Sequence, residues 1–545
     1  MARSETDSET IGQFDYIIVG AGTAGCLLAN RLSADPGRKV LLLEAGGKDD
    51  WIWFHIPVGY LYSQGNPRAD WCFKTAADPG LNGRSLNYAR GKVLGGCSAI
   101  NGMIYMRGQA ADYDHWRQLG NVGWSWDDVL PIFKQTEDHF AGESDLHGAD
   151  GEWRVEEPRI SWKILDAFRE AAAEIGIPRI DDFNGGDNEG SAYFQVNQKK
   201  GVRWHSAKAF LKPAKDRANL TVLTHAQTER LLLDGKRVTG VEFRQGRGLK
   251  RATADAEVIL AAGAIGSPQI LQLSGIGPGP LLAEHGIEVN HELSGVGENL
   301  QDHLQLRLAY KVQNIETLNE MSQSLFSKAK MALDYALFRR GPLTMAPSQL
   351  GAFAKSSDDF ATANLQYHVQ PLTLEKFGEP LHPFPAFTAS VCNLRPESRG
   401  HVRIKSTDPT AAPEIQLNYL SADKDKQVAA DAIRLTRRIV LETETMKPYQ
   451  PEEFMPGLEA QSAADLVKAA GDIGTTIFHP VSTCKMGSDA AAVVDDQLRV
   501  HGIEHLRIAD ASIMPTITSG NTNSPTLMIA EKAAAMILSG ERAVR

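Results

Sequence analysis

A glycine-rich turn near the start of the chain carries residue types that bind phosphate groups. The run "GAGTAG" follows an apolar stretch and precedes a second one, "CLLANRL". A strand that ends at Val19 and a helix that opens near Thr23 would aim unpaired backbone N–H groups at an anion. Gly25 lets that helix pack close to the sheet, and Glu44, at the end of "KVLLLE", can accept hydrogen bonds from a ribose hydroxyl. The pattern predicts a dinucleotide site, which NAD and FAD fit equally well.

Other segments supply the elements that must position this site. Segment 219–243 is typical of a hairpin that turns at Asp234 and Gly235, and "EVILAAGA" (257–264) of a strand that runs into a helix. Segment 49–74 is dense in aromatic and turn-forming residues, which predicts a long loop or lid rather than a helix.

Glycine content distinguishes two further regions of the chain. The five glycines of 91–108 suit a backbone that lies against a flat ligand. Between about 311 and 474 glycines become rarer, and amphipathic helices alternate with candidate strands, as in a separate domain.

Composition limits the classes of protein that fit this chain. Its 545 residues are enough for two or three domains, and 42% hydrophobic with 23% charged residues is ordinary for a soluble globular protein. The net charge of −10 argues against a nucleic-acid partner. The polar N-terminus and the lack of an apolar run of ~20 residues favour a cytoplasmic protein without a membrane span. The five cysteines lack CxxC spacing, so neither a disulfide framework nor a metal site is expected.

Five long motifs, in this order, resemble those of the glucose–methanol–choline (GMC) oxidoreductase family. They are "DYIIVGAGTAGCLLANRLS", "RGKVLGGCSAINGMIYMRG", "GAIGSPQILQLSGIG", "HPVSTCKMG" and "RIADASIMPTITSGNTNSPTLMIAEKAA". The resemblance covers nearly the whole chain and is closest to bacterial dehydrogenases of alcohols, choline and polyethylene glycol. It implies FAD as the cofactor.

The resemblance also implies an α/β fold with two domains. A Rossmann-like FAD-binding domain would be assembled from residues 1–155, 200–310 and 475–545. A substrate-binding domain, residues 156–199 and 311–474, would be built on a mixed or antiparallel sheet.

Oxidising an alcohol with a flavin requires a base for the hydroxyl proton and a hydride acceptor beside the carbon. His479 opens the motif that resembles the family's catalytic histidine motif, and a neutral imidazole accepts protons at physiological pH. The resemblance therefore implies hydride transfer to flavin N5 with His479 as the base. We expect His303, in "NLQDH", to be structural.

Asn523 occupies the place where the resemblance puts the second catalytic residue. An amide is no base at this pH, but it can hydrogen-bond the substrate oxygen. Ser524 followed by Pro525 is typical of an N-cap and a first helical position. The resemblance implies that the positive end of that helix faces the flavin pyrimidine ring, where it would stabilise negative charge.

The resemblance assigns FAD contacts to further residues of these motifs. Asn101 and Gly102 would lie near flavin N5, Asp510 and Ala511 near the pyrophosphate, and Thr228 at the adenine. The full set expected to bind FAD is Gly20, Gly22, Thr23, Ala24, Gly25, Glu44, Ala45, Arg90, Val93, Gly96, Asn101, Gly102, Met103, Ile104, Thr228, Ala262, Asp510, Ala511, Thr522, Ser524 and Pro525. Ile100 stands where some relatives carry a histidine bonded to the flavin, so we expect non-covalent FAD.

The expected reaction is oxidation of a primary alcohol to an aldehyde. The alternative is a lyase on the same fold, like the photodecarboxylases and hydroxynitrile lyases of the family. The photodecarboxylases lack the catalytic histidine and have a cysteine where this chain has Leu394. The aromatic segment 51–73 could form a cation–π cage for choline or an apolar channel. The sequence leaves open the alcohol, the electron acceptor (oxygen, a quinone or a cytochrome) and whether the protein is a monomer or a homodimer.

Overall fold

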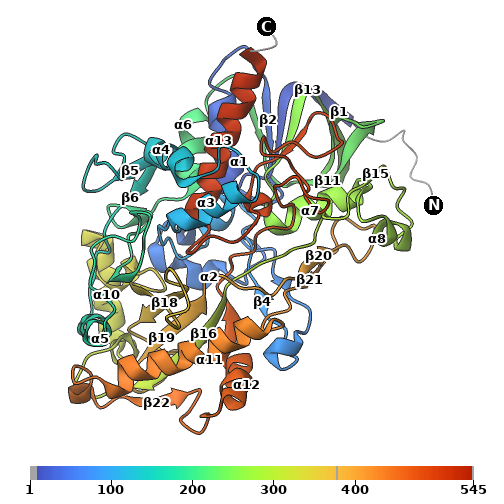
Figure 1. Cartoon of the computed structure of the whole chain (residues 1–545). Coiled ribbons are helices and arrows are strands. Elements are labelled where there is room, and N and C mark those ends of the chain that lie inside the picture. The colour runs from blue at the N-terminus through green and yellow to red at the C-terminus, as the bar shows by residue number, and fades with distance from the viewer. Residues whose placement is uncertain (1–8, 376–378, 543–545) are drawn as a thin grey trace.

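Two sheets, one above the other, organise the molecule (Figure 1). The computed structural model describes residues 9–375 and 379–542. The first sheet lies in the half of the molecule that holds both termini and carries the glycine-rich turn. The second sheet is covered on its outer face by helices α11 (Asp423–Arg437) and α12 (Ala463–Ile473). The mixed α/β fold with a Rossmann-type domain is therefore confirmed.

The first sheet is built on the expected βαβ unit. β1 (Glu9–Val19) and β2 (Val40–Leu43) pair in parallel, with α1 (Thr23–Leu32) between them in sequence. All of β2 and residues 16–19 of β1 are buried and mainly apolar, as strands covered on both faces of a parallel sheet are. Further parallel partners are β10 (Leu220–Leu223), β13 (Gly248–Leu260) and β24 (Leu506–Ile508), while β11 (Ala226–Asp234) and β12 (Arg237–Gln245) add an antiparallel hairpin.

Three expected elements differ from the structure in detail. The hairpin comprises only β11 and β12 and turns through Gly235 and Lys236, because β10 pairs separately with β2. The strand expected at 257–264 ends at Leu260. The last two residues of that expected range already belong to α7 (Gly263–Leu273), which begins at a glycine with a φ of +77°. The loop expected at 49–74 contains the short helical turns η2 (Ile52–Phe54), η3 (Pro57–Gly59) and α2 (Tyr60–Ser63).

The second sheet is antiparallel throughout. Its order is β22 (Glu452–Met455), β16 (Leu304–Lys311), β19 (Ala386–Asn393), β18 (Leu365–Gln370), β17 (Leu350–Ala354) and β7 (Gly190–Tyr193), with β23 (Gly474–Thr476) also paired to β16. Alternate residues such as Leu306, Leu308 and Val391 join the apolar core with α11, and the intervening residues face the first sheet.

The membership of two strands in this sheet shifts the expected domain boundaries. β16 begins at Leu304, so the FAD segment expected to end at 310 includes most of a strand of the second sheet. β23 likewise spans the boundary expected between 474 and 475. The chain passes from one part to the other directly through these strands, without a linker whose composition would reveal the change. The division into two discontinuous domains stays a prediction.

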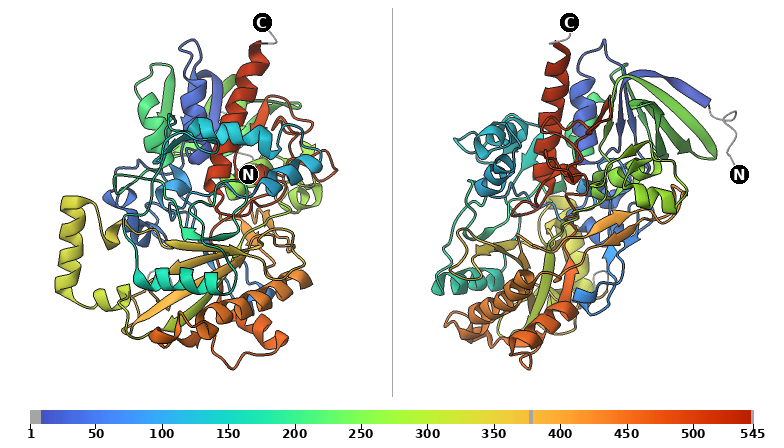
Figure 2. Two further views of the ribbon diagram at one scale, coloured as in Figure 1. Left: turned by 60° about the vertical axis from the view of Figure 1, so that its left-hand side comes forward. Right: turned by 45° about the vertical axis from the view of Figure 1, so that its right-hand side comes forward.

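Helices cover the outside of both parts. α13 (Asn523–Arg542) lies along α1 beside the first sheet, as the two views of Figure 2 show. Further helices are α3 (Ala110–Gln118), α4 (Trp126–Thr136), α5 (Lys163–Glu174) and α10 (Leu325–Phe338). None of the helices in the described ranges combines the length and the apolar character that crossing a membrane requires.

Candidate active site

A cavity of about 1330 Å³ lies between the two sheets, where the carboxyl ends of β1 and β2 meet the inner face of the second sheet. Ligands of open α/β sheets bind at this position. All residues expected at the site line the cavity except Gly25, Val93, Ser524 and Pro525. The structure thus brings together residues from both ends of the chain.

The three glycines of the first turn have different roles. Gly20 has a φ of +100°, and a Cβ there would lie 2.6 Å from the carbonyl oxygen of Ala261. A Cβ at Gly25 would lie 1.8 Å from the carbonyl oxygen of Gly20, so only glycine lets α1 approach β1. A Cβ at Gly22 would meet no protein atom nearer than Gly96 Cα at 4.0 Å, and Gly22 lines the cavity. Its bare backbone therefore suits close approach by a pyrophosphate.

Glu44 braces the same turn. Its carboxylate accepts hydrogen bonds from the backbone N–H groups of Ala21 at 2.9 Å and Gly46 at 2.7 Å. Burial raises the pKa of Glu44 to about 7, although both hydrogen bonds oppose the shift. The residue lines the cavity at the carboxyl end of β2, as the expected ribose contact requires.

Two buried polar atoms on the cavity wall test whether a nucleotide cofactor fits. In the described part of the chain, neither Thr228 Oγ1 nor Asn523 Nδ2 has a hydrogen-bond partner. Both residues line the cavity. Buried polar groups normally have a partner, so these two fit a polar ligand that passes from the first turn of α13 to β11. The residues present therefore fit FAD.

Neighbouring residues of the expected FAD set are held firmly by the protein. Asp510 accepts hydrogen bonds from the Gly263 N–H at 2.8 Å and the Ser267 hydroxyl at 2.6 Å, and so fixes the first turn of α7. Asn101 Oδ1 accepts from the Met103 N–H at 2.9 Å and from Arg203 at 3.0 Å. These contacts shape the wall before any ligand binds.

His479 lies on the cavity wall and is 7% exposed. Its Nδ1 lies 3.0 Å from Nδ1 of His303, and Nε2 of His303 lies 3.1 Å from the carbonyl oxygen of Leu394. A carbonyl only accepts, so His303 carries its proton on Nε2 and its Nδ1 is an acceptor. His479 must then donate from Nδ1, which leaves its Nε2 unprotonated. Nε2 accordingly accepts a hydrogen bond from Asn521 Nδ2 at 3.1 Å.

The electrostatic surroundings keep both imidazoles neutral. Burial lowers the pKa of His479 well below its usual value, and positive charge on His303, His368 or Arg90 would lower it further. Burial likewise lowers the pKa of His303 to about 4. The expectation that His303 is only structural missed its contact with His479, which no local sequence pattern reveals across 176 residues.

Asp302 fixes the backbone of both histidines. One carboxylate oxygen accepts hydrogen bonds from the N–H groups of His303 at 3.0 Å and His479 at 2.7 Å. The other accepts from the hydroxyls of Tyr88, Tyr419 and Thr476. No sequence motif points to Asp302, although it precedes His303 directly.

The asparagine beside His479 is Asn521, whereas the resemblance predicted Asn523 in that role. Asn523 Oδ1 instead accepts a hydrogen bond from the Thr23 hydroxyl at 2.7 Å, at the first turn of α1. Asn521 Oδ1 accepts from Gln366 Nε2 of the second sheet at 3.3 Å. Residues 521 and 523 thus contact different parts of the cavity wall.

The expected helix cap at Ser524 is wrong. α13 begins at Asn523, and the Thr526 N–H donates to the carbonyl oxygen of Thr522 at 3.1 Å, so Thr522 occupies the cap position. The Ser524 hydroxyl is buried and has no partner among the described residues. Pro525 is the third helical residue and lies in the first turn, where a missing N–H costs nothing because the backbone N–H at this position has no intrahelical acceptor.

Comparison with known proteins identifies the family. Models of the N- and C-terminal parts of GMC oxidoreductases match residues 14–305 and 396–530. The chain belongs to the GMC oxidoreductase family. This GMC oxidoreductase is 43% identical over 533 residues to the oxygen-dependent choline dehydrogenase of Shigella flexneri serotype 5b, covering 96% of this chain and 95% of the relative.

Solved structures agree with this assignment. Pyridoxine 4-oxidase from Mesorbium loti has a TM-score of 0.87 and 32% identity, with 96% of this chain and 98% of the other covered. A fungal aryl-alcohol oxidase has a TM-score of 0.85 and 25% identity, with 97% and 99% covered. The protein is a FAD-dependent oxidoreductase that acts on CH–OH donors, and these relatives give no support to the lyase alternative.

Proposed function

We propose that this GMC oxidoreductase converts a primary alcohol to an aldehyde, with His479 Nε2 as the base that takes the hydroxyl proton. The observation that carries the proposal is the hydrogen-bond chain from Leu394 through His303 to His479. It fixes the Nδ1–H tautomer of His479 and leaves Nε2 unprotonated on the cavity wall. A neutral imidazole in this tautomer is ready to accept a proton.

Asn521 orients the substrate beside this base. Its Nδ2 contacts His479 Nε2, so an alcohol oxygen bound there can accept from the amide while its proton faces the imidazole. Gln366 holds the amide in that orientation. After proton transfer, His479 shares its new Nε2 proton with the product oxygen.

Bound FAD supplies the hydride acceptor for the alcohol carbon. Gly20, Gly22 and Glu44 would hold its pyrophosphate and ribose, Thr228 its adenine end, and Asn101, Gly102 and the first turn of α13 its flavin ring. Ile100 has no nucleophilic atom, which supports non-covalent binding. The cytoplasmic location and the monomeric or homodimeric state stay predictions from the sequence.

Anaerobic titration with a panel of primary alcohols tests the proposal. We expect at least one primary alcohol to bleach the flavin absorbance in the dark and to yield one equivalent of aldehyde per flavin. A panel that leaves the flavin oxidised, or a reaction that needs light, would contradict alcohol oxidation.

A further inference from the structure

The inner face of the second sheet forms a polar floor under the cavity. Across β16, β19 and β18, the register aligns Gln305, Cys392 and Gln366 in one row and Arg307, Ser390 and His368 in the next. The apolar residues between them belong to the core on the opposite face. Gln305, Arg307 and His368 line the cavity. A polar face on a covered sheet suits a polar ligand rather than core packing.

Arg307 is the charged residue of this floor. Its Nη2 donates to the carbonyl oxygen of Leu374 at 3.0 Å and its Nη1 to that of Glu375 at 3.4 Å. No carboxylate in the described ranges forms an ion pair with Arg307. Burial lowers the pKa of Arg307, and the negative charge of Glu375 offsets only part of this shift. A guanidinium has five N–H donors in a planar fork that matches a carboxylate. Arg307 therefore has donors left for an anionic ligand.

His368 completes the same row. It is 3% exposed, and its Nε2 has no hydrogen-bond partner among the described residues. Burial and His303 lower its pKa to about 3, so it stays neutral. The row lies beside the row of Gln366, which contacts Asn521 and through it His479. Neighbouring rows are about 7 Å apart along the strands, and Arg307 and Gln366 also stand two strands apart, about 10 Å across the sheet.

The floor of the cavity offers little to a cationic substrate. The floor strands β16, β18 and β19 carry no acidic residue. Two aromatic rings of segment 51–73 already have cationic neighbours, since Lys92 Nζ lies 4.3 Å from the Trp71 ring and Arg68 Cζ 5.1 Å from the Trp51 ring.

The remaining carboxylates of the cavity wall are placed elsewhere. Glu44 and Asp510 hold turns of the first sheet, and Asp472 accepts a hydrogen bond from Asn82. Glu375 and Glu379 are exposed, and Glu375 lies 3.6 Å from His382. None of these carboxylates forms an ion pair with Arg307 in the described ranges, although the negative charge of Glu375 offsets part of the lowering of the Arg307 pKa.

We infer that the alcohol carries an anionic group, of the hydroxy-carboxylate class, which Arg307 binds while the hydroxyl lies at His479 and Asn521. This inference rests on the proposed function. It separates this chain from the choline dehydrogenases that it resembles, whose named substrate is a cation.

The test compares three small primary alcohols of different charge on the FAD-loaded enzyme. They are 4-hydroxybutanoate, the neutral 3,3-dimethylbutan-1-ol and its cationic isostere choline. The variants are Arg307→Gln and Arg307→Lys, with Arg179→Gln, an exposed arginine paired with Glu170, as the matched control. Flavin content confirms that each variant is folded. Binding of butanoate, which has no hydroxyl to oxidise, is measured by calorimetry on the oxidised enzyme.

We expect kcat/KM to be highest for 4-hydroxybutanoate. Arg307→Gln should raise its KM roughly 10- to 100-fold relative to that of the neutral alcohol and weaken butanoate binding to the same degree, as expected for a lost charge-assisted pair. Arg307→Lys should recover part of both effects, and Arg179→Gln should change neither. A preference for choline, or butanoate binding that is insensitive to Arg307→Gln, would overturn the inference.

The two proposals fail in different ways. If no alcohol reduces the flavin while butanoate still binds through Arg307, the anion site stands and alcohol oxidation fails. If the neutral alcohol is oxidised while Arg307→Gln leaves butanoate binding unchanged, alcohol oxidation stands and the anion site is wrong.

Discussion

Two histidines that touch through their Nδ1 atoms decide which nitrogen of His479 is free to act as a base. Replacing His303 by alanine removes the acceptor for the Nδ1 proton, so His479 loses its fixed tautomer. We expect the activation free energy of flavin reduction to rise by about 1–3 kcal/mol, which slows the reaction roughly 5- to 150-fold. His303→Asn supplies an amide oxygen as acceptor and should retain more activity. Equal rates for wild type and His303→Ala in anaerobic rapid mixing would show that the tautomer is fixed by other means.

The two asparagines before and at the start of α13 form a matched pair for a second prediction. Asn521→Ala removes the contact to His479 Nε2. It should raise the activation free energy of flavin reduction by about 1–3 kcal/mol while the FAD content stays unchanged. Asn523→Ala removes a contact to Thr23 and should mainly weaken FAD retention. Rapid mixing and flavin absorbance after gel filtration distinguish the two. The opposite pattern would return Asn523 to the catalytic position that the sequence suggested.

At the scale of elements, two glycines of the first βαβ unit have different roles: Gly25 is needed for folding and Gly22 for cofactor binding. Gly25→Ala places a Cβ 1.8 Å from a backbone oxygen and should prevent α1 from packing on β1. Gly22 has a φ of −76°, which alanine adopts readily, and its Cβ would point into open space. Gly22→Ala should therefore keep the fold but lose FAD. Circular dichroism and flavin content test this, and a yellow Gly22→Ala protein would contradict the assigned role.

The sequence predicted the elements whose signals are local. The first βαβ unit, the hairpin turn after Asp234 and the helix near residue 525 follow from periodicity and turn residues within short windows. The predicted cap position of α13 was wrong because Thr522, Asn523 and Ser524 are all residue types that cap helices. Proline is accepted at several positions of the first turn, so Pro525 does not distinguish among them. The His303–His479 contact and the polar floor could not be predicted, since both depend on pairing between strands far apart in sequence.

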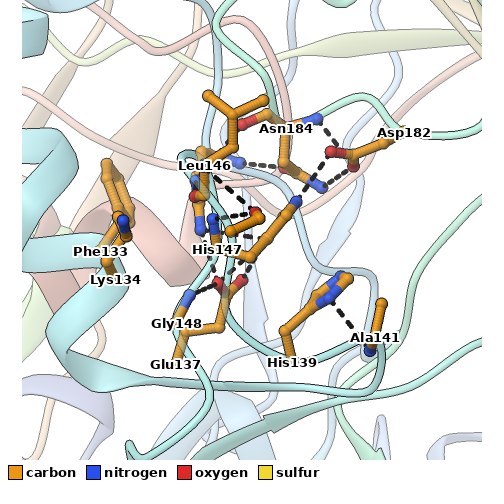
Figure 3. A network of polar contacts seen from close by, with 12 residues as sticks. Phe133, Lys134, Glu137, His139, Ala141, Leu146, His147, Gly148, Asp182 and Asn184 are labelled. Atoms are coloured by element: carbon orange, nitrogen blue, oxygen red, sulfur yellow. Dashed lines mark hydrogen bonds and ion pairs between the residues drawn. The ribbon is translucent and has the colours of Figure 1, made fainter.

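At the scale of the whole molecule, a buried charge network joins segments around β5 (Glu137–His139) to the glycine-rich segment that lines the cavity. Figure 3 shows His147 between Glu137 and Asp182. Nδ1 of His147 lies 3.0 Å from Glu137 Oε2, and its Nε2 lies 2.9 Å from Asp182 Oδ2. Arg107, fully buried, donates to Glu137 at 2.8 Å. Burial alone would lower the pKa of His147, but the hydrogen bonds to Asp182 and Glu137 outweigh it and raise the pKa to about 9.

This network predicts a pH-dependent contribution to stability. Because its pKa is raised on folding, His147 stabilises the fold fully below about pH 6.5 and loses this effect as pH rises through 9. We expect His147→Gln to lower the free energy of unfolding by about 1–3 kcal/mol at pH 6, with the difference shrinking towards pH 9. His115→Gln, on the exposed side of α3, is the control. A difference from wild type that stays constant between pH 6 and pH 9 would show that His147 is not charged.

Anaerobic rapid mixing of His479→Ala with its alcohol substrate tests the central claim most directly. Loss of the base should slow flavin reduction ~10²–10⁴-fold while FAD stays bound. For the wild type, kcat/KM should stay constant above about pH 6.5, because burial lowers the pKa of His479 well below that value. A His479→Ala enzyme that reduces its flavin at a rate near that of the wild type would contradict the assignment of His479 as the base.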